Sequence, residues 1–421
     1  MKTEHKQVVV VGAGPSGSTV SALLKSRGID VVVIEKATFP RFSIGESLLP
    51  ACMEVVELAG MTEAVKQHGF QFKDGAAFRR NGVYTHFDFT DKFTAGPGTT
   101  FQVQRASFDK VLADSAAEQG VDIRYQHELV SLAFEGKKSR LEVVGPDKQA
   151  YQIEADFVLD ASGFGRVLPR LLDLEEPSCL PPRKAIFTHI EDHISPQEPE
   201  YDRNKILISV HPENHDVWYW LIPFSNGTCS FGVVGEPEFF EQYPEDKLAA
   251  LQQLANEEPG LASLLRNAKY PNPAGELGGY SANVKRLATE HYALLGNAGE
   301  FLDPVFSSGV TIAMKSAQFA ADCVVRQLNG EVVDWQEEYS ERLMVGVNTF
   351  RTYVEGWYNG TLQDVIFYQA PNPRIKQMIS AILAGYAWDT ENPYVKQSEQ
   401  RLSTLAELVR GEGFKLPRKN H

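Results

Sequence analysis

The chain has 421 residues, of which 43% are hydrophobic and 23% charged, and its formal net charge is -14. This length favours two or three lobes over one simple core. The negative charge repels nucleic-acid phosphates and anionic membrane surfaces, so we expect a small-molecule substrate and no nucleic-acid partner. No segment has the roughly 20 consecutive apolar residues of a membrane span, and no apolar run at the start fits a secretory signal. We therefore expect a cytoplasmic protein without a membrane span.

The cysteines Cys52, Cys179, Cys229 and Cys323 are scattered along the chain. Their spacing fits neither a metal site nor a disulfide frame, so we predict no metal. We expect each of them to be a reduced thiol that packs in the core.

The first 36 residues predict a β-strand, an α-helix and a second β-strand. Two β-branched runs, Val8–Val11 and Val31–Ile34, flank a helical stretch with Val20, Leu23 and Leu24 on one side. Such a βαβ unit opens a parallel sheet.

The turn of this unit carries the pattern G-x-G-x-x-G at Gly12, Gly14 and Gly17. The first glycine permits a tight turn, the second lets backbone N–H groups approach a pyrophosphate, and the third brings the helix close to the strand. Glu35 ends the second strand, where its carboxylate can accept hydrogen bonds from ribose hydroxyls. The pattern therefore predicts a dinucleotide site, although a purely structural glycine turn is the alternative.

The middle and the end of the chain differ from this beginning. Asn81-Gly82 and Asn226-Gly227 each stand between alternating residues, which predicts two β-hairpins. After Gly330, aromatic and aliphatic residues recur at helical spacing, so we expect a helical layer that closes over the other two lobes.

Two further segments resemble the glutathione-reductase-type flavoproteins of the hydroxylase branch. The segment "FQVQRASFDKVLADSAAEQGVDI" contains Arg105, which this resemblance places near the cofactor phosphates, and Asp109, which opens a helix. The segment "YALLGNAGEFLDPVFSSGVTIAMKSA" resembles the second FAD motif of that family, with Asn297 where Asp is usual. Asn297 can still hydrogen-bond ribityl hydroxyls. The resemblance implies FAD. The lack of a second G-x-G-x-x-G argues against a dedicated NAD(P)H domain, so reducing equivalents would arrive on free reduced flavin from a separate flavin reductase or through transient contact with a nicotinamide.

The stretch "PRFSIGESLLP", Pro40 to Pro50, is similar to a segment of flavin-dependent halogenases that act on phenols and pyrroles. A related Gly-Glu-Ser region occurs in polyprenyl reductases and some monooxygenases, so this segment alone leaves the reaction open. By this resemblance Arg41 is a cation on the cofactor side, and the turn from Gly45 to Ser47 presents polar groups to the flavin.

Two other motifs favour halogenation. Trp218, Trp220 and Ile222 match W-x-W-x-I-P and share one face of a strand, so the indoles would form a wall beside the flavin. An ordinary aromatic pair in a sheet core is the alternative. Lys73 stands in the Gly-Phe-x-x-Lys-x-Gly context of the halogenase lysine, which passes oxidised halogen to the aromatic ring. Burial would lower its pKa and favour a chloramine.

The turn "DPVFSSGV" implies a halide site. The resemblance assigns chloride or bromide to the backbone N–H groups at Ser308 and Gly309, at the N-terminus of a helix. Phe306 occupies the position of a glutamate that tryptophan halogenases carry, which argues against free tryptophan and for a phenol, a pyrrole or a carrier-bound aromatic acyl group.

The resemblance predicts an α/β fold with a Rossmann-type FAD-binding domain, an antiparallel-sheet substrate domain and a helical C-terminal region. Their residues would be 1–75, 98–180 and 285–330 for the first, 76–97 and 181–284 for the second, and 331–421 for the third. The implied catalytic residues are Lys73, Trp218 and Trp220. The implied cofactor residues are Gly12, Gly14, Pro15, Ser16, Gly17, Glu35, Lys36, Arg41, Gly45, Ser47, Arg105, Leu129, Asn297, Pro304, Gly309 and Val310.

We therefore expect an FAD-dependent oxidoreductase, a two-component halogenase that uses reduced FAD, a halide and an electron-rich aromatic, with an acyl carrier protein as a further partner. The alternatives are an aromatic monooxygenase, a flavin reductase of the geranylgeranyl-reductase kind, and a flavin-binding protein without turnover.

Overall fold

A computed structural model describes residues 3–279 and 281–411. Its first sheet has seven strands in the order β7-β2-β1-β10-β9-β8, with β18 beside β10. Their bounds are β1 (Thr3–Val11), β2 (Val31–Glu35), β7 (Asp122–Tyr125), β8 (Glu128–Glu135), β9 (Lys138–Val144), β10 (Ala150–Asp160) and β18 (Tyr292–Leu294). The pairs among β7, β2, β1, β10 and β18 are parallel, whereas β8, β9 and β10 form an antiparallel meander.

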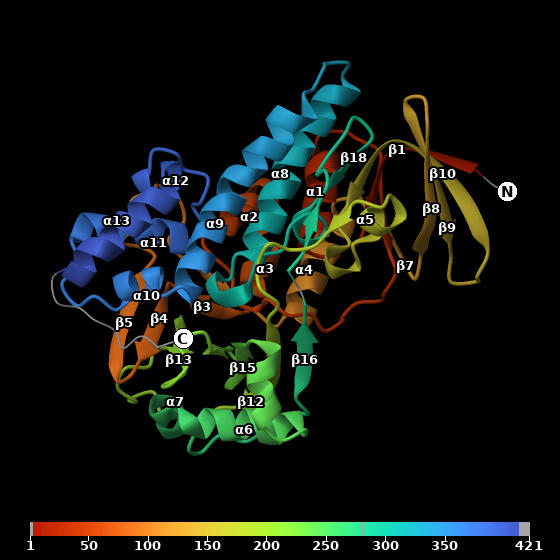
Figure 1. The fold of residues 1–421 in the computed structure, drawn as a ribbon. Coiled ribbons are helices and arrows are strands. Elements are labelled where there is room, and N and C mark those ends of the chain that lie inside the picture. Colours follow the sequence, from red (N-terminus) through yellow and green to blue (C-terminus); the bar gives the residue numbers. More distant parts are fainter. Residues whose placement is uncertain (1–2, 280, 412–421) are drawn as a thin grey trace.

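The valines of β1 are buried on both faces of this sheet, and helices cover one of the two faces. Val8 and Val10 belong to the main core with the apolar residues of α1 (Pro15–Ser26) and α8 (Gly309–Leu328). Val9 and Val11 pack on the other face, in a smaller core with the β8–β9 meander. Helix α1 lies between α8 and α4 (Arg105–Glu118) at the centre of the molecule (Figure 1). The βαβ prediction is confirmed.

The second sheet also has seven strands, in the order β16-β12-β15-β14-β13-β4-β5. Their bounds are β4 (Gly75–Arg80), β5 (Val83–Asp88), β12 (Lys184–Glu191), β13 (Lys205–Val210), β14 (Trp218–Pro223), β15 (Thr228–Gly235) and β16 (Gly275–Gly278). Both predicted hairpins form, and Asn81 and Gly82 have the positive φ angles, 48° and 77°, of a tight two-residue turn. All pairs are antiparallel except β4 with β13. Helices α6 (Lys247–Glu257) and α7 (Pro259–Leu264) pack on its outer face (Figure 1).

The C-terminal part is helical, as predicted. It contains a π-helix (Trp335–Glu341), α9 (Arg342–Tyr358), α10 (Thr361–Ile366), α11 (Pro373–Leu383), α12 (Pro393–Lys396) and α13 (Ser398–Gly411). These helices lie beside the β4–β5 edge of the second sheet (Figure 1). Shorter elements connect the layers: α2 (Cys52–Leu58), α3 (Thr62–Gln67), β3 (Gln71–Lys73), β6 (Thr100–Gln102), α5 (Val167–Leu171), β11 (Glu175–Glu176) and β17 (Asn283–Val284).

The α/β fold with two sheets and a helical C-terminal region agrees with the predicted fold class. The domain boundaries stay a prediction, and residues 1–2, 280 and 412–421 of the predicted segments lie outside the described residues. The expectation for the cysteines is wrong at one position, since Cys179 is exposed while the other three thiols are buried. Cys179 lies in a loop after α5, outside any helix or strand, so no apolar face of such an element buries it. Among the described residues no helix is long and apolar enough to cross a membrane.

Candidate active site

A cavity of about 820 Å³ runs between the first sheet and the second. Ligand and cofactor sites have about 300–1,000 Å³, so this volume suits a large cofactor. The predicted cofactor residues Gly12, Gly14, Pro15, Ser16, Glu35, Lys36, Arg41, Gly45, Ser47, Arg105, Leu129, Asn297, Pro304, Gly309 and Val310 all line it, together with Trp218 and Trp220. Gly17, Lys73 and Ser308 are not among its lining residues.

The glycine turn between β1 and α1 forms one end of the cavity. Gly12 has a φ of +98°, and a Cβ atom there would lie 2.6 Å from the carbonyl oxygen of Ala161. A Cβ atom on Gly17 would lie 1.9 Å from the carbonyl oxygen of Gly12, so the third glycine serves the contact between helix and turn. The turn thus brings backbone and the N-terminus of α1 to the cavity, as binding of a pyrophosphate requires.

Glu35 is held rigidly at the end of β2. Its two carboxylate oxygens accept hydrogen bonds from the backbone N–H groups of Ala13 and Ala37, each at 2.8 Å. The side chain therefore braces the glycine turn while it lines the cavity where a ribose would bind.

Two arginines lie where the 41–47 loop meets α4. The Arg105 guanidinium donates to Asp109 Oδ1 at 2.7 Å and to the Ile44 carbonyl at 2.6 Å, so it holds the loop against the helix. Arg41 Nη1 lies 3.7 Å from Asp109 Oδ2, and its side chain is about one-third exposed. Arg41 is therefore the more accessible cation for a pyrophosphate, and Arg105 positions the loop. The glycine cradle, the helix N-terminus and this cation together fit FAD.

Trp218 and Trp220, the predicted wall, line the cavity from β14 of the second sheet. Both indoles lie on β14 with ring centroids 6.0 Å apart. Trp220 Nε1 donates to Ser230 Oγ at 3.0 Å, and its ring lies so close to Gly232 that a Cβ atom there would be 2.3 Å away. Each indole is thereby held in one orientation.

A hydrogen-bond chain connects this wall to the turn before α8. Trp218 Nε1 donates to Tyr358 Oη at 3.0 Å, and Tyr358 Oη donates to Asp303 Oδ2 at 2.9 Å. Asp303 Oδ1 in turn accepts from the backbone N–H of Val305 at 3.0 Å. Apart from the helical spacing of the aromatic residues near it, no pattern in the sequence points to this role for Tyr358.

Lys73 lies directly behind the cavity. Its Nζ donates to Ser47 Oγ and to the Leu48 carbonyl, each at 2.7 Å, and lies 5.5 Å from the centre of the Phe89 ring. The side chain is fully buried, and burial lowers the pKa of Lys73 to about 7. Ser47 lines the cavity, so its hydroxyl is the contact between the cavity and the amine.

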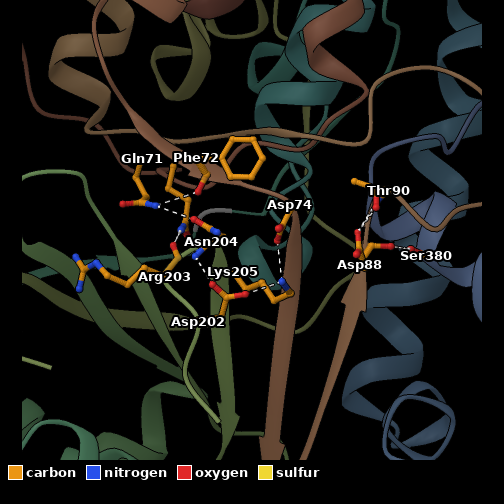
Figure 2. Close-up of polar contacts among 11 residues, drawn as sticks. Gln71, Phe72, Asp74, Asp88, Thr90, Asp202, Arg203, Asn204, Lys205 and Ser380 are labelled. Carbon is orange, nitrogen blue, oxygen red and sulfur yellow. Dashed lines mark hydrogen bonds and ion pairs between the residues drawn. The ribbon is translucent and has the colours of Figure 1, made fainter. Parts of the chain in front are cut away.

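Polar contacts on both sides of Lys73 fix its strand. Figure 2 shows the Gln71 side chain donating to Asn204 Oδ1, at 3.2 Å, and Lys205 Nζ donating to Asp74 Oδ1, at 2.8 Å. Lys205 also donates to Asp202 at 2.7 Å. Asn204 and Lys205, at the start of β13, therefore hold the residues on both sides of Lys73, Gln71 at the start of β3 and Asp74 directly after it.

The predicted halide turn lies at the N-terminus of α8. Ser307 has a φ of 56°, and Ser308 occupies the N-cap position of the helix without a capping hydrogen bond from its side chain. Ser307 and Gly309 line the cavity, whereas Ser308 is buried outside its lining. Ser307 thus joins Gly309 at the cavity, and the assignment of a halide to the backbone N–H groups at Ser308 and Gly309 stays a prediction.

Glu46 and His189 form a pair at the cavity wall for which the sequence predicted no role. Glu46 Oε1 lies 2.8 Å from His189 Nε2, between the 41–47 loop and β12. Glu46 belongs to the Gly-Glu-Ser motif, but His189 stands in no motif, and only the fold brings the two together.

Comparison with known proteins gives the class to which this site belongs. The family model of the FAD binding domain matches residues 5–226, and the chain belongs to this family. A crystal structure described as a flavoprotein/dehydrogenase from Cytophaga hutchinsonii is 42% identical and has a TM-score of 0.93, over 98% of this chain and 100% of that one.

The relatives of this chain include flavin-dependent halogenases. The 1H-pyrrole-2-carbonyl-[peptidyl-carrier protein] brominase of Pseudoalteromonas luteoviolacea is 28% identical over 406 residues, 91% of this chain and 93% of the relative. The structure of the myxobacterial chondrochloren halogenase is 26% identical, with a TM-score of 0.72, over 96% of this chain and 97% of that one. The resemblance to halogenases, the FAD cofactor and the class of FAD-dependent oxidoreductase are thus confirmed.

Proposed function

We propose that the protein halogenates an electron-rich aromatic ring, a phenol or a pyrrole carried on a peptidyl carrier protein, with reduced FAD delivered by a separate flavin reductase. The observation that carries this proposal is the Lys73 amine, buried behind Ser47 at the edge of the FAD cavity. The similarity to a carrier-protein pyrrole brominase supports the substrate class. A cytoplasmic location stays a prediction.

The buried amine suits transfer of an oxidised halogen. When FAD is bound and reduced, it would react with oxygen and a halide to supply the electrophilic halogen. Because burial lowers the pKa of Lys73 to about 7, a large share of the amine is neutral and nucleophilic at neutral pH. The neutral amine can take up the halogen, and the ammonium form can hydrogen-bond hypohalous acid. Ser47 Oγ, 2.7 Å from Nζ, is the natural point of entry.

The Trp218–Trp220 wall supports the same reaction. Both indoles line the FAD cavity and are held by hydrogen bonds, so an aromatic substrate on their far side has no direct access to the cofactor. A small oxidant can still pass. Ser307 and Gly309 also line the cavity, and the backbone N–H groups near them, at the N-terminus of the 20-residue helix α8, suit a halide ion.

The test is product analysis by mass spectrometry. Purified protein, a flavin reductase, NADH and FAD are incubated with a panel of phenols and pyrrole-2-carbonyl thioesters in bromide, chloride or halide-free buffer. We expect products with the bromine or chlorine isotope pattern only when halide is present. Conversion of the panel to hydroxylated or dehydrogenated products, equal in all three buffers, would refute halogenation.

A second candidate function is a flavin-linked oxidation that needs no halide. The flavoprotein/dehydrogenase at 42% identity is the observation that favours it. Fast oxidation of NADH by the protein without a reductase would support this candidate, because a two-component halogenase takes its reduced flavin from another protein.

A further inference from the structure

Glu46 and His189 form a buried acid–base pair between the cavity and solvent. The Glu46 side chain is only 2% exposed, and Glu46 lines the cavity. The His189 side chain is 24% exposed, and its Nε2 lies 2.8 Å from Glu46 Oε1. One end of the pair therefore meets the cavity and the other end meets water.

The proposed reaction, on which this inference rests, consumes protons in that cavity. Reduced FAD in its anionic form, oxygen and a halide ion take up two protons and give oxidised FAD, hypohalous acid and water. The flavin and the halide each give two electrons, which reduce oxygen. A closed site must bring these protons in from solvent through groups that can bind and release them.

The other titratable groups that line the cavity are engaged elsewhere. His127 and Glu128 lie beside Glu35, at the predicted ribose site, where His127 Nδ1 is 2.8 Å from the Tyr125 carbonyl oxygen and Glu128 pairs with Lys36 at 2.7 Å. Both oxygens of Glu35 are occupied by backbone N–H groups, and Glu276 is paired with Lys184 at 3.0 Å. Arg41 and Arg105 carry guanidinium groups, which are hydrogen-bond donors without an acceptor atom. Glu46 stands next to Ser47, the contact to Lys73, and is thus at the end of the cavity where oxidised halogen would be used.

We propose that His189 and Glu46 form a proton relay from solvent to the flavin end of the cavity. His189 gives its Nε2 proton to Glu46 Oε1, Glu46 passes a proton into the cavity, and His189 takes up another from water. Transfer across 2.8 Å is within ordinary hydrogen-bond reach.

The surroundings of His189 keep it able to carry the proton. Burial by itself lowers the pKa of His189, but the hydrogen bond and charge of Glu46 outweigh this effect and raise it. The rings of Phe42 and Phe224 lie beside the imidazole, and Ser230 is the register partner of His189 on β15. Among the described residues, Glu46 is the charged group that acts on this imidazole.

The test follows reoxidation of reduced, protein-bound FAD by oxygen in bromide buffer, by stopped-flow absorbance between pH 5.5 and 9. The variants are His189→Gln and Glu46→Gln, with His193→Gln as a matched control, because His193 pairs with Glu191 at 3.2 Å on the surface. We expect reoxidation at pH 7.5 to slow by about 10²-fold in the first two variants. Added imidazole should restore much of the rate in His189→Gln, and the control should behave as wild type.

A wild-type rate and pH profile in His189→Gln, or a slow rate that imidazole does not restore, would overturn the relay. A measurement without cofactor or turnover keeps the proposal testable if a variant misfolds. NMR titration of wild-type His189 should give a pKa above 6.5, and a value below it would also overturn the relay. Imidazole-rescued reoxidation without any halogenated product would overturn halogenation and leave the relay standing, since reduction of oxygen to hydrogen peroxide also consumes a proton.

Discussion

Replacement of Lys73 by Met should change how stability depends on pH. Lys73 is fully buried, and burial lowers its pKa from 10.5 to about 7. Between these values the folded protein holds the amine neutral, while the unfolded chain still binds its proton. Unfolding therefore takes up a proton in this window, and Lys73 makes stability rise with pH by about 1.4 kcal/mol per pH unit. The whole effect amounts to about 5 kcal/mol.

Methionine has a similar length and cannot titrate, so the variant should lack this contribution. The free energy of unfolding of wild type minus that of Lys73→Met should rise by about 3 kcal/mol from pH 7 to 9.5. Loss of the donor to Ser47 Oγ and the Leu48 carbonyl costs the variant about 1–3 kcal/mol for each acceptor, but this cost does not depend on pH. Only the slope therefore reports on Lys73.

The assay is urea unfolding followed by tryptophan fluorescence at fixed FAD concentration, with Lys66→Met as the control. Lys66 lies on α3 with its side chain 59% exposed, so its replacement should leave the pH dependence of stability unchanged. A difference between wild type and Lys73→Met that stays constant from pH 7 to 9.5 would refute the reasoning, because Lys73 would then titrate at its ordinary value.

Two further substitutions and one labelling experiment test the cavity and the core. Gly12→Ala should yield protein without bound flavin, because the new Cβ atom would lie 2.6 Å from the Ala161 carbonyl oxygen at a φ of +98°. The measurement is the absorbance near 450 nm, and a yellow variant would contradict the role of the glycine turn in binding. Gly232→Ala should displace the Trp220 indole and cost about 1–3 kcal/mol, measured by thermal unfolding; an unchanged midpoint would show that the indole lies elsewhere. In the native protein a thiol reagent should label Cys179 far faster than the buried Cys52, whose pKa burial raises to about 12; rapid labelling of Cys52 would contradict its burial.

Local patterns predicted the parts of the fold that short segments determine. The β-branched runs and the glycine turn specify β1, α1 and β2 without help from the rest of the chain. The Asn-Gly pairs specify both hairpins because only residues that tolerate positive φ fit such turns. The parallel pairing of β4 with β13 depends on two segments more than 100 residues apart, so no local pattern contains it.

The site was predictable only where motifs carry it. Nearly all predicted cofactor residues line the cavity. Many of them belong to the glycine turn or to the loop around Gly45, and the residues of these short segments themselves specify the backbone conformation that lines the cavity. The partners of these residues come from distant strands and helices. Tyr358 reaches Trp218 from the end of α9, and His189 reaches Glu46 from β12. Neither pair leaves a pattern in the sequence, since the contacts exist only after the two sheets and α9 pack together.

The most direct test of the proposed function is the yield of halogenated product from a single load of reduced FAD. Wild type, Lys73→Met and Lys66→Met, each saturated with FAD, receive a phenol or pyrrole that wild type accepts, with bromide and oxygen, and products are counted by mass spectrometry. We predict that Lys73→Met loses product formation by at least about 10²-fold while its flavin still reoxidises, and that Lys66→Met matches wild type. Equal product from Lys73→Met and wild type would contradict the central role of the buried amine.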